Sequence, residues 1–223
     1  EITLPEDINK ILLSKFTQEQ IKFLILINPT LILAIAVAIG TLLHEKVNLE
    51  VPIIKSIITK NRNFDLKQIL LFGALGGIIA GTLISAGSQI FAPYIPNELL
   101  ELTENIHINL ANRFLYGGLT EEILMRFGFM TLAVWLISII FKSKSTKIYW
   151  IGIVISSIIF ALGHFPIVFK TVSNPSTILL TYVIVGNSIG GLFFGWLYWK
   201  KGLEAAMVAH IFTHIVMVLA AYL

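Results

Sequence analysis

The sequence predicts an all-α fold: a polytopic membrane bundle of about six transmembrane helices, with one or two interfacial amphipathic helices. Of the 223 residues, 56% are hydrophobic and only 13% are charged, whereas soluble globular chains carry about 25% charged residues. The mean hydropathy is +0.85, and the apolar residues form runs long enough to cross a bilayer. No internal repeat or linker divides the chain, so we expect a single integral-membrane domain over residues 1–223.

The chain begins with a mixed polar and apolar segment. We expect a short amphipathic helix over 2–16 that lies at the membrane surface, with Pro5 at its start. No signal sequence with a small-residue cleavage site is visible there. The first span is expected at 21–43. Asn28 and Pro29 interrupt it, which a membrane helix tolerates when neighbouring groups satisfy the freed backbone.

The second span is expected at 66–91, after a polar connection over 44–65. A long link, 92–118, follows it and carries an expected interfacial helix at about 97–110. The link ends in a glycine pair, 117–118, which we interpret as a break before the third span. The second span has glycines at the four-residue spacing that lets another helix pack closely: Gly73, Gly76, Gly77 and Gly81.

The third span, expected at 120–141, carries the most costly residues of the chain. Thr120 is the expected N-cap, with Glu121 and Glu122 in the first turn. Arg126 follows Glu122 by four positions. A charged side chain at the centre of a span costs about 2.5–3.5 kcal/mol. A chain that keeps three such groups so close together is expected to use them.

Three more spans follow, at 148–165, 177–199 and 203–223, and Pro166 is expected to stop the first of them. Asn187 is expected to make an interhelical hydrogen bond, with a role in a site as the alternative. The span at 177–199 has close-packing glycines: Gly186, Gly190, Gly191 and Gly195. It ends in aromatic residues expected to form a belt at the membrane surface: Trp196, Tyr198 and Trp199.

Charge and cysteine content exclude several functions. The formal net charge is +3 and comes from loop lysines, so no nucleic-acid surface is expected. The absence of cysteine excludes a disulfide, a thiolate nucleophile and a cysteine metal site. Lysine and arginine are concentrated in the loops after spans one, three and five, which predicts that these loops are cytoplasmic and both termini outside. Lysines near the N-terminus favour the opposite orientation.

Histidines in two other spans can join the third-span carboxylates. His164 ends the fourth span, which runs antiparallel to the third, so it is expected beside Glu121 and Glu122. His210 and His214 are four positions apart and share one face of the sixth span. At 1.5 Å per residue from Leu203 they lie roughly 10–16 Å into the bilayer. We therefore expect them at the floor of a cavity, with the carboxylates near its mouth.

This set of residues is suited to hydrolysing an amide. A carboxylate can take a proton from water, and a histidine can hold that water or protonate the leaving amine. Histidine donors can stabilise an oxyanion. Arg126 is expected to pair with Glu122, leaving Glu121 free as a base. Alternatively, three histidines and Glu121 can hold zinc with an open position. The candidate catalytic residues are Glu121, Glu122, Arg126, His164, His210 and His214.

Each feature also has a purely structural interpretation. The carboxylates can favour the dipole of a helix start, and Arg126 can extend its charge to the membrane surface. His164, two positions before a proline, can simply end a helix. A histidine pair inside a span is harder to explain in this way. The coincidence of all three features favours a functional site.

At these residues the sequence resembles the CAAX-protease and bacteriocin-processing family, the CPBP or Abi group of intramembrane endopeptidases. Glu121-Glu122-x-x-x-Arg126 matches the EExxxR motif of that family. Phe160-x-x-x-His164 matches its FxxxH motif, and His210 begins a third motif of the HxxxN type. The resemblance covers about half of the chain, from about Tyr116 to the C-terminus, with a catalytic core at about 112–223.

The resemblance implies an all-helical membrane endopeptidase, and eukaryotic and archaeal relatives remove the last three residues of prenylated CAAX proteins. It implies that Glu121 activates water with help from His164, and that His210 and the residue four positions later line the oxyanion site. Glu122 and Arg126 would then be supporting residues. This chain has His214 where the family often has Asn. The family is described both as metal-dependent and as a metal-independent glutamate protease, and its cavity opens to the cytoplasm, unlike the orientation that the loop lysines predict.

Three hypotheses follow. The first is an endopeptidase in a prokaryotic cell membrane that acts on a membrane-associated peptide or lipidated protein of CAAX type, without a required cofactor or, alternatively, with zinc. The second is a non-catalytic immunity or scaffold protein of the same family. The third is a transporter or proton pathway lined by the same groups, which the absence of inverted repeats disfavours. Membrane lipid is the expected surroundings of all three.

Overall fold

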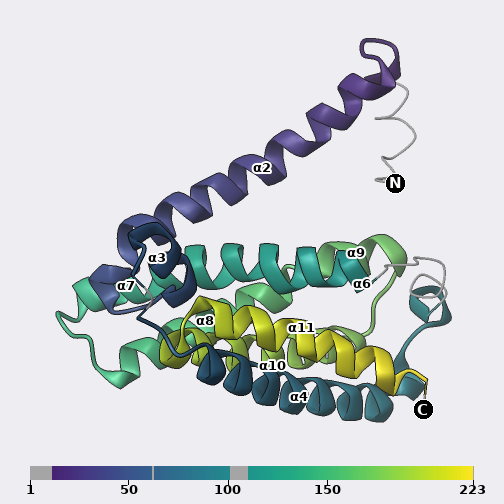
Figure 1. Ribbon diagram of the computed structural model, residues 1–223. Helices are drawn as coiled ribbons and strands as arrows, with labels where there is room; N and C mark the ends of the chain where they lie inside the picture. Colours follow the sequence, from purple (N-terminus) through teal and green to yellow (C-terminus); the bar gives the residue numbers. More distant parts are fainter. Residues whose placement is uncertain (1–11, 62, 101–109, 223) are drawn as a thin grey trace.

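The computed structural model describes residues 12–61, 63–100 and 110–222, and these residues form helices and connections without a β-strand. Figure 1 shows the helices as a bundle from which α2 diverges. The α-helices are α2 (Gln18–Leu43), α3 (Pro52–Thr59), α4 (Leu66–Phe91), α6 (Leu110–Asn112), α7 (Thr131–Ile140), α8 (Thr146–Leu162), α9 (Phe165–Thr171), α10 (Thr177–Lys201) and α11 (Leu203–Ala220). Two short 3₁₀ helices are η1 (Glu45–Val47) and η2 (Ala92–Tyr94), and two π-helices are η3 (Arg113–Glu121) and η4 (Ile123–Met130).

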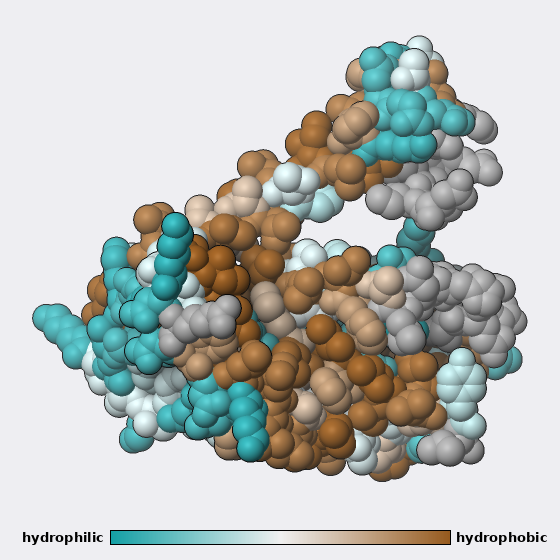
Figure 2. All heavy atoms as spheres, in the orientation of Figure 1, coloured by the Kyte–Doolittle hydropathy of each residue, from teal (hydrophilic) through white to brown (hydrophobic). Residues whose placement is uncertain are grey.

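In the described part of the chain, six helical stretches are long and apolar enough to cross a membrane. They are Gln18–Leu43, Leu66–Tyr94, Arg113–Ile140, Thr146–Thr171, Thr177–Lys201 and Leu203–Ala220. The all-α fold and the six spans are thereby confirmed. Figure 2 shows hydrophobic residues over the middle of the bundle and along α2, whereas hydrophilic residues gather at the bundle end that carries α3. Such an apolar band is what a protein surrounded by lipid exposes.

Helix α2 begins with a capping box. The Thr17 hydroxyl accepts a hydrogen bond from the Gln20 backbone N–H, and the Gln20 side chain accepts one from the Thr17 backbone N–H. Pro29 lies inside the helix and does not end it. The helix is therefore continuous where the sequence suggests an interruption. Only the C-terminal half of α2 packs on the bundle, where Ala36 lies against Gly128 of η4.

Glycines set the spacing between α4 and α11, as the sequence predicts. A Cβ at Gly73 would lie 2.7 Å from the Val208 side chain, and one at Gly81 would lie 2.8 Å from Val216. On α10, Gly191 packs in the same way against Ser157 of α8. Gly186 differs from the expectation, because a Cβ there would meet nothing within 4 Å. It lines a cavity instead.

The third span begins earlier than the sequence suggests. The helix is continuous from Leu110 to Ile140, so the glycine pair 117–118 is not a break. Both glycines are buried, because helix α11 packs against them: a Cβ at Gly118 would lie 2.5 Å from the Ile211 side chain. Thr120 is therefore not an N-cap. Its hydroxyl donates to the Leu115 carbonyl oxygen, 3.0 Å away, inside the π-helix.

The end of the fourth span also differs. Helix α8 ends at Leu162, before Pro166, and His164 is the N-cap of the next helix, α9. Pro166 lies in the first turn of α9, where the missing N–H is tolerated. The proline therefore begins a helix instead of stopping one. His164 therefore lies in the two-residue connection between the two helices, after Gly163.

The prediction that Tyr198 belongs to an aromatic belt at the membrane surface is wrong. This residue has no exposed surface, because it lies on the face of α10 that packs against the third span. Its hydroxyl lies 2.9 Å from the Thr131 hydroxyl of α7. Trp199 is half-buried and stacks on Tyr149 of α8, with ring centroids 4.8 Å apart. The two predicted interfacial helices, at 2–16 and about 97–110, fall largely outside the described residues.

Candidate active site

A cavity of about 720 Å³ opens among η3, α8, α10 and α11, with one contribution from α4. Its volume is within the range of about 300–1,000 Å³ that is typical of small-molecule pockets. The cavity lies toward the bundle end opposite the lysine-rich connections, since it is lined by the start of η3, the end of α8 and the end of α11. Its polar lining residues include Glu121, His164, Asn187, His210 and His214.

The two adjacent carboxylates lie in different surroundings. Neighbouring residues of a helix point roughly 100° apart, so Glu121 and Glu122 cannot face the same way. The Glu121 side chain is 19% exposed and lines the cavity. The Glu122 side chain has no exposed surface. One carboxylate is therefore open to a ligand and the other is enclosed by protein.

Glu122 belongs to a buried cluster that also contains Arg126 and His210. Its Oε1 accepts a hydrogen bond from His210 Nδ1 at 2.9 Å, and its Oε2 lies 3.4 Å from Arg126 Nε. The Arg126 guanidinium stacks over the rings of Phe160 and Phe194, at 5.3 Å and 5.8 Å from the centroids. The predicted pairing of Glu122 with Arg126 is confirmed.

The buried cluster orients His210 for the cavity. A carboxylate can only accept, so His210 carries a hydrogen on Nδ1. The other ring nitrogen, Nε2, lies 3.8 Å from Glu121 Oε2. The ring is held between Phe194, 4.5 Å away, and His214, 4.9 Å away, both nearly parallel to it. His210 thus connects the enclosed carboxylate to the accessible one.

Gly117 leaves room for both imidazoles of α11. A Cβ at this position would lie 2.6 Å from His214 Nε2 and 3.3 Å from His210 Nε2. Any larger residue would displace at least one ring from its present position. The glycine that the sequence suggests as a helix break therefore serves to bring two ring nitrogens against the backbone of η3. The π-helical form of η3 fits this location, because π-helices are concentrated at functional sites.

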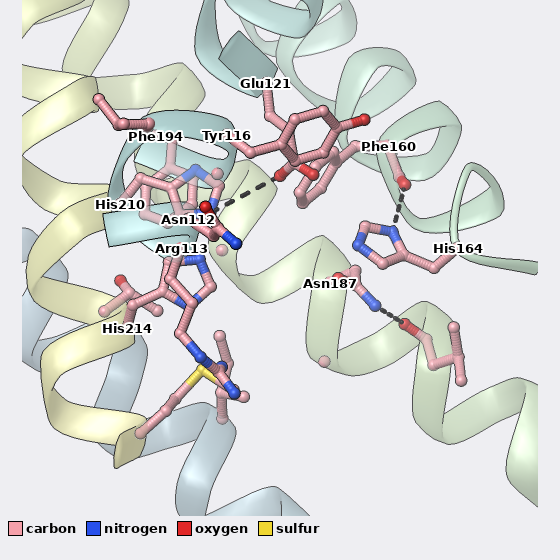
Figure 3. Close-up of a pocket in the computed structure, with 18 of the residues that line it drawn as sticks. Asn112, Arg113, Tyr116, Glu121, Phe160, His164, Asn187, Phe194, His210 and His214 are labelled. Carbon is pink, nitrogen blue, oxygen red and sulfur yellow. Dashed lines mark hydrogen bonds and ion pairs between the residues drawn. The ribbon is translucent and has the colours of Figure 1, made fainter. Parts of the chain in front are cut away.

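His164 lines the cavity from the opposite wall. Figure 3 shows His164 and Asn187 on one side of the cavity, with His210 and His214 on the other and Glu121 between them. His164 Nδ1 lies 2.9 Å from the Phe160 carbonyl oxygen, so it donates and leaves Nε2 free. The hydrogen bond of Asn187 goes to the Val183 carbonyl within its own helix, at 2.8 Å, and not between helices as expected.

The expected depth of the site needs correction. The carboxylates were expected near the mouth of the cavity and the histidines on its floor. Instead Glu122 bonds directly to His210, so the carboxylates and imidazoles share one level of the bundle. The reason is the longer third span, which begins at Arg113 and places Glu121 well inside the helix. Five of the six predicted residues form one connected group, in which Glu122 and Arg126 are enclosed and Glu121, His210 and His214 line the cavity, whereas His164 lies across the cavity from that group.

The donor set does not fit a zinc ion. Among the described residues, no group of three or more His, Asp or Glu side chains is placed to hold one metal. His210 is engaged by Glu122, and His164 lies across the cavity from His214. The alternative of a zinc site made by three histidines and Glu121 is therefore not supported by the described residues.

Several lining residues were not predicted. Phe194 stacks on His210, and nothing in the pattern of α10 distinguishes it from a packing residue. Tyr116 and Arg113 lie on η3 and line the cavity. Both fall in the link, 92–118, that the sequence suggests before the third span, and the helix that continues through the glycine pair brings them to the cavity. Thr213 lines the cavity between the two histidines of α11.

The fold and the site define a polytopic membrane protein with an internal cavity where carboxylate and imidazole groups can transfer protons. A family model described as type II CAAX prenyl endopeptidase Rce1-like matches residues 103–216, just over half of the chain. The chain therefore belongs to the Rce1-like family of membrane proteases, and the resemblance carried by the three motifs is confirmed. No significant match was found among curated proteins or among solved structures.

Proposed function

We propose that the protein is an intramembrane endopeptidase that hydrolyses a peptide bond of a membrane-associated, prenylated CAAX-type substrate. One observation carries the proposal. Glu121 is the one acidic side chain that lines the cavity among the described residues, while its neighbour Glu122 is enclosed and paired. The family description supports the class of substrate. The apolar surroundings of the six spans suit a substrate held at the membrane by a lipid chain.

Glu121 and His210 provide a place for the attacking water. Glu121 Oε2 and His210 Nε2 are 3.8 Å apart, and both accept hydrogen bonds when His210 carries its hydrogen on Nδ1. A water between them donates one hydrogen to each, which leaves a lone pair for the carbonyl carbon of the substrate. As the new C–O bond forms, Glu121 takes the proton from the water.

The negative charge then moves to the former carbonyl oxygen. His214 Nδ1 is buried without a hydrogen-bond partner in the described part of the chain. A buried donor without a partner is costly, so a neutral His214 carries its hydrogen on Nε2, beside Gly117. That N–H is the donor that the oxyanion requires. An Asn at this position, as in many family members, would offer an equivalent N–H.

The intermediate collapses when the C–N bond breaks. The leaving nitrogen needs a proton, and the one held by Glu121 returns to it directly or through His164 across the cavity. The water thus contributes its hydroxyl to the new carboxyl end and its proton to the new amine. Glu122 and Arg126 hold His210 in place and take no part in the proton transfer.

The decisive test replaces Glu121 by Gln, which keeps the shape of the side chain and removes the base. The substrate is a farnesyl-cysteine peptide with three further residues and a free C-terminus, and its products are quantified by mass spectrometry. Loss of general-base catalysis lowers kcat by about 10²–10⁴-fold. The matched control is Glu98→Gln, an exposed glutamate outside the cavity, which is expected to cleave like the wild type.

Thermal unfolding in detergent shows whether each variant is folded. A folded Glu121→Gln protein with unchanged cleavage would reject Glu121 as the base. A wild-type protein that binds the peptide and leaves it intact would instead favour the non-catalytic scaffold hypothesis.

A further inference from the structure

Among the residues that line the cavity there is one permanent cation, and the described part of the chain offers it no hydrogen-bond or ion-pair partner. Arg113, at the start of η3, is the single lysine or arginine among the residues that line the cavity. It is half-buried, and no other described residue forms a hydrogen bond or an ion pair with it. Figure 3 shows it on the same wall as His214, away from His164. A guanidinium always keeps its charge.

The other arginine of this span shows what an arginine at this depth normally has. Arg126 is enclosed, faces Glu122 and is covered by two aromatic rings. Charged groups inside membrane proteins are costly and are generally paired. Arg113 has no such partner in the described part of the chain, although Glu121 lies on the same helix. An anion that enters the cavity would supply the missing partner, and a carboxylate matches the fork of a guanidinium with two parallel hydrogen bonds.

The spacing along the third span indicates where that anion lies in a substrate. Arg113 precedes Glu121 by eight positions on one continuous helix. At 1.5 Å per residue this is about 12 Å, or slightly less in a π-helix, which has more residues in each turn. An extended peptide advances about 3.3 Å per residue. The α-helical spacing corresponds to between three and four extended residues and the shorter π-helical spacing to about three, so a carboxylate at Arg113 lies about three residues beyond a peptide bond that is attacked beside Glu121.

We propose that Arg113 binds a carboxylate of the peptide substrate, about three residues to the C-terminal side of the cleaved bond, and so selects where the chain is cut. The carboxylate comes either from the C-terminus of the substrate or from an acidic side chain at the same distance. This inference rests on the proposed function for its chemistry. It adds a specificity residue on the same helix as the base, with no part in the proton transfer.

The test compares peptides that differ only in that carboxylate. The probes are a farnesyl-cysteine peptide with three aliphatic residues after the cysteine, made as the free acid and as the C-terminal amide. A third probe is the amide with Asp as its last residue. A hydrogen-bonded charge pair corresponds to about a 10- to 100-fold preference. We expect the wild type to prefer the free acid by that factor in kcat/KM, mainly through KM.

Variants of Arg113 remove the preference. Arg113→Gln is expected to bring the acid-to-amide ratio close to one, and Arg113→Lys to give an intermediate ratio, because lysine keeps the charge but loses the planar fork. Lys170→Gln is the matched control. Lys170 is an exposed cation in the last turn of α9, at the same end of the bundle, and it does not line the cavity. This control is expected to keep the wild-type ratio.

The outcomes distinguish the two possible sources of the carboxylate, and they also show whether Arg113 contacts a carboxylate at all. Recovery of the preference by the Asp-amide probe assigns the contact to any carboxylate at that distance, and no recovery assigns it to the chain terminus. Equal cleavage of acid and amide by the wild type would overturn the proposal. An Arg113→Gln variant whose kcat/KM falls by the same factor for both peptides would also overturn the proposal. That result would assign Arg113 to the lipid headgroup region.

A binding measurement keeps this inference distinct from the proposed function. The inactive Glu121→Gln protein is titrated with fluorescent free-acid and amide peptides, and anisotropy reports the two dissociation constants. The free acid is expected to bind about 10- to 100-fold more tightly than the amide. The combined Glu121→Gln, Arg113→Gln variant is expected to bind both alike. A preference for the acid that survives in this double variant would overturn the role of Arg113, whether or not the wild type cleaves either peptide.

Discussion

Two polar regions of the molecule differ in how their charges are satisfied. The buried cluster of Glu122, Arg126 and His210 is closed to solvent, and each charge faces a partner within the protein. The cavity next to it holds Glu121 and Arg113, which lie on the same helix without pairing. The same residue types thus fix the structure in one region and remain available to a ligand in the other.

Aromatic side chains separate the two regions. Phe160 and Phe194 line the cavity, and the Arg126 guanidinium lies over both rings. Phe194 also stacks on His210. The rings keep water from the buried cluster, which strengthens its ion pair and makes the loss of either partner costly. Only His210 belongs to both regions, because one ring nitrogen faces Glu122 and the other faces Glu121.

The largest expected effect on stability comes from the buried cluster. Arg126→Met removes the cation and leaves the Glu122 carboxylate buried without its counter-charge. Breaking a buried pair in this way typically destabilises by about 3–5 kcal/mol. We expect a clear fall in the unfolding temperature, measured in detergent micelles, whereas Glu121→Gln unfolds like the wild type.

A double variant completes that comparison. Glu122→Gln together with Arg126→Met leaves no unpaired charge, so we expect it to regain a large part of the stability lost by Arg126→Met alone. If Arg126→Met instead unfolds at the wild-type temperature, the cluster is not the structural element that its burial indicates.

A smaller effect is expected where the two regions meet. Gly117→Ala places a methyl group 2.6 Å from His214 Nε2 and 3.3 Å from His210 Nε2. The rings must move by a few tenths of an ångström or more. Misplaced catalytic groups lower rates strongly, by up to about 100-fold, whereas overpacking costs about 1–3 kcal/mol in stability. We expect kcat to fall by about 10- to 100-fold while the protein remains folded.

Gly186 provides the matched control for this substitution. It lines the same cavity, and a Cβ there would meet nothing within 4 Å. Gly186→Ala should therefore cleave within about threefold of the wild type, a difference below 1 kcal/mol. Equal losses in the two alanine variants would mean that crowding of the cavity, and not displacement of the imidazoles, causes the effect.

The fold was predictable because its signals are local. Runs of apolar residues that match the thickness of a bilayer gave the six spans. The four-residue spacing of Gly73, Gly77 and Gly81 gave the close contact between α4 and a neighbour, although the sequence did not say that the neighbour is α11. The start of the third span was missed, because a glycine pair also signals a helix break. Only the contact with α11 explains why the helix continues through it.

The site was predictable in composition and less so in arrangement. The spacing of Glu122 and Arg126 predicted their pairing, and the spacing of His210 and His214 predicted a shared face. The predicted depth of the carboxylates was wrong, because it depended on a third span that begins at Thr120. Arg113 falls within the expected link, 92–118, for the same reason. Phe194 and the burial of Tyr198 depend on contacts between distant spans, which no local pattern contains.

The smallest expected effect lies at the far side of the buried cluster. The Thr131 hydroxyl lies 2.9 Å from the Tyr198 hydroxyl and donates to the Arg126 carbonyl oxygen at 3.2 Å. Tyr198→Phe removes the first bond and keeps the second, so Thr131 is not left without a partner. The expected loss is about 0.5–1.5 kcal/mol, visible as a small fall in unfolding temperature. Because Tyr198 does not line the cavity, cleavage and the acid-to-amide ratio should stay at wild-type values, and a change in either would mean that the two regions are coupled through α10.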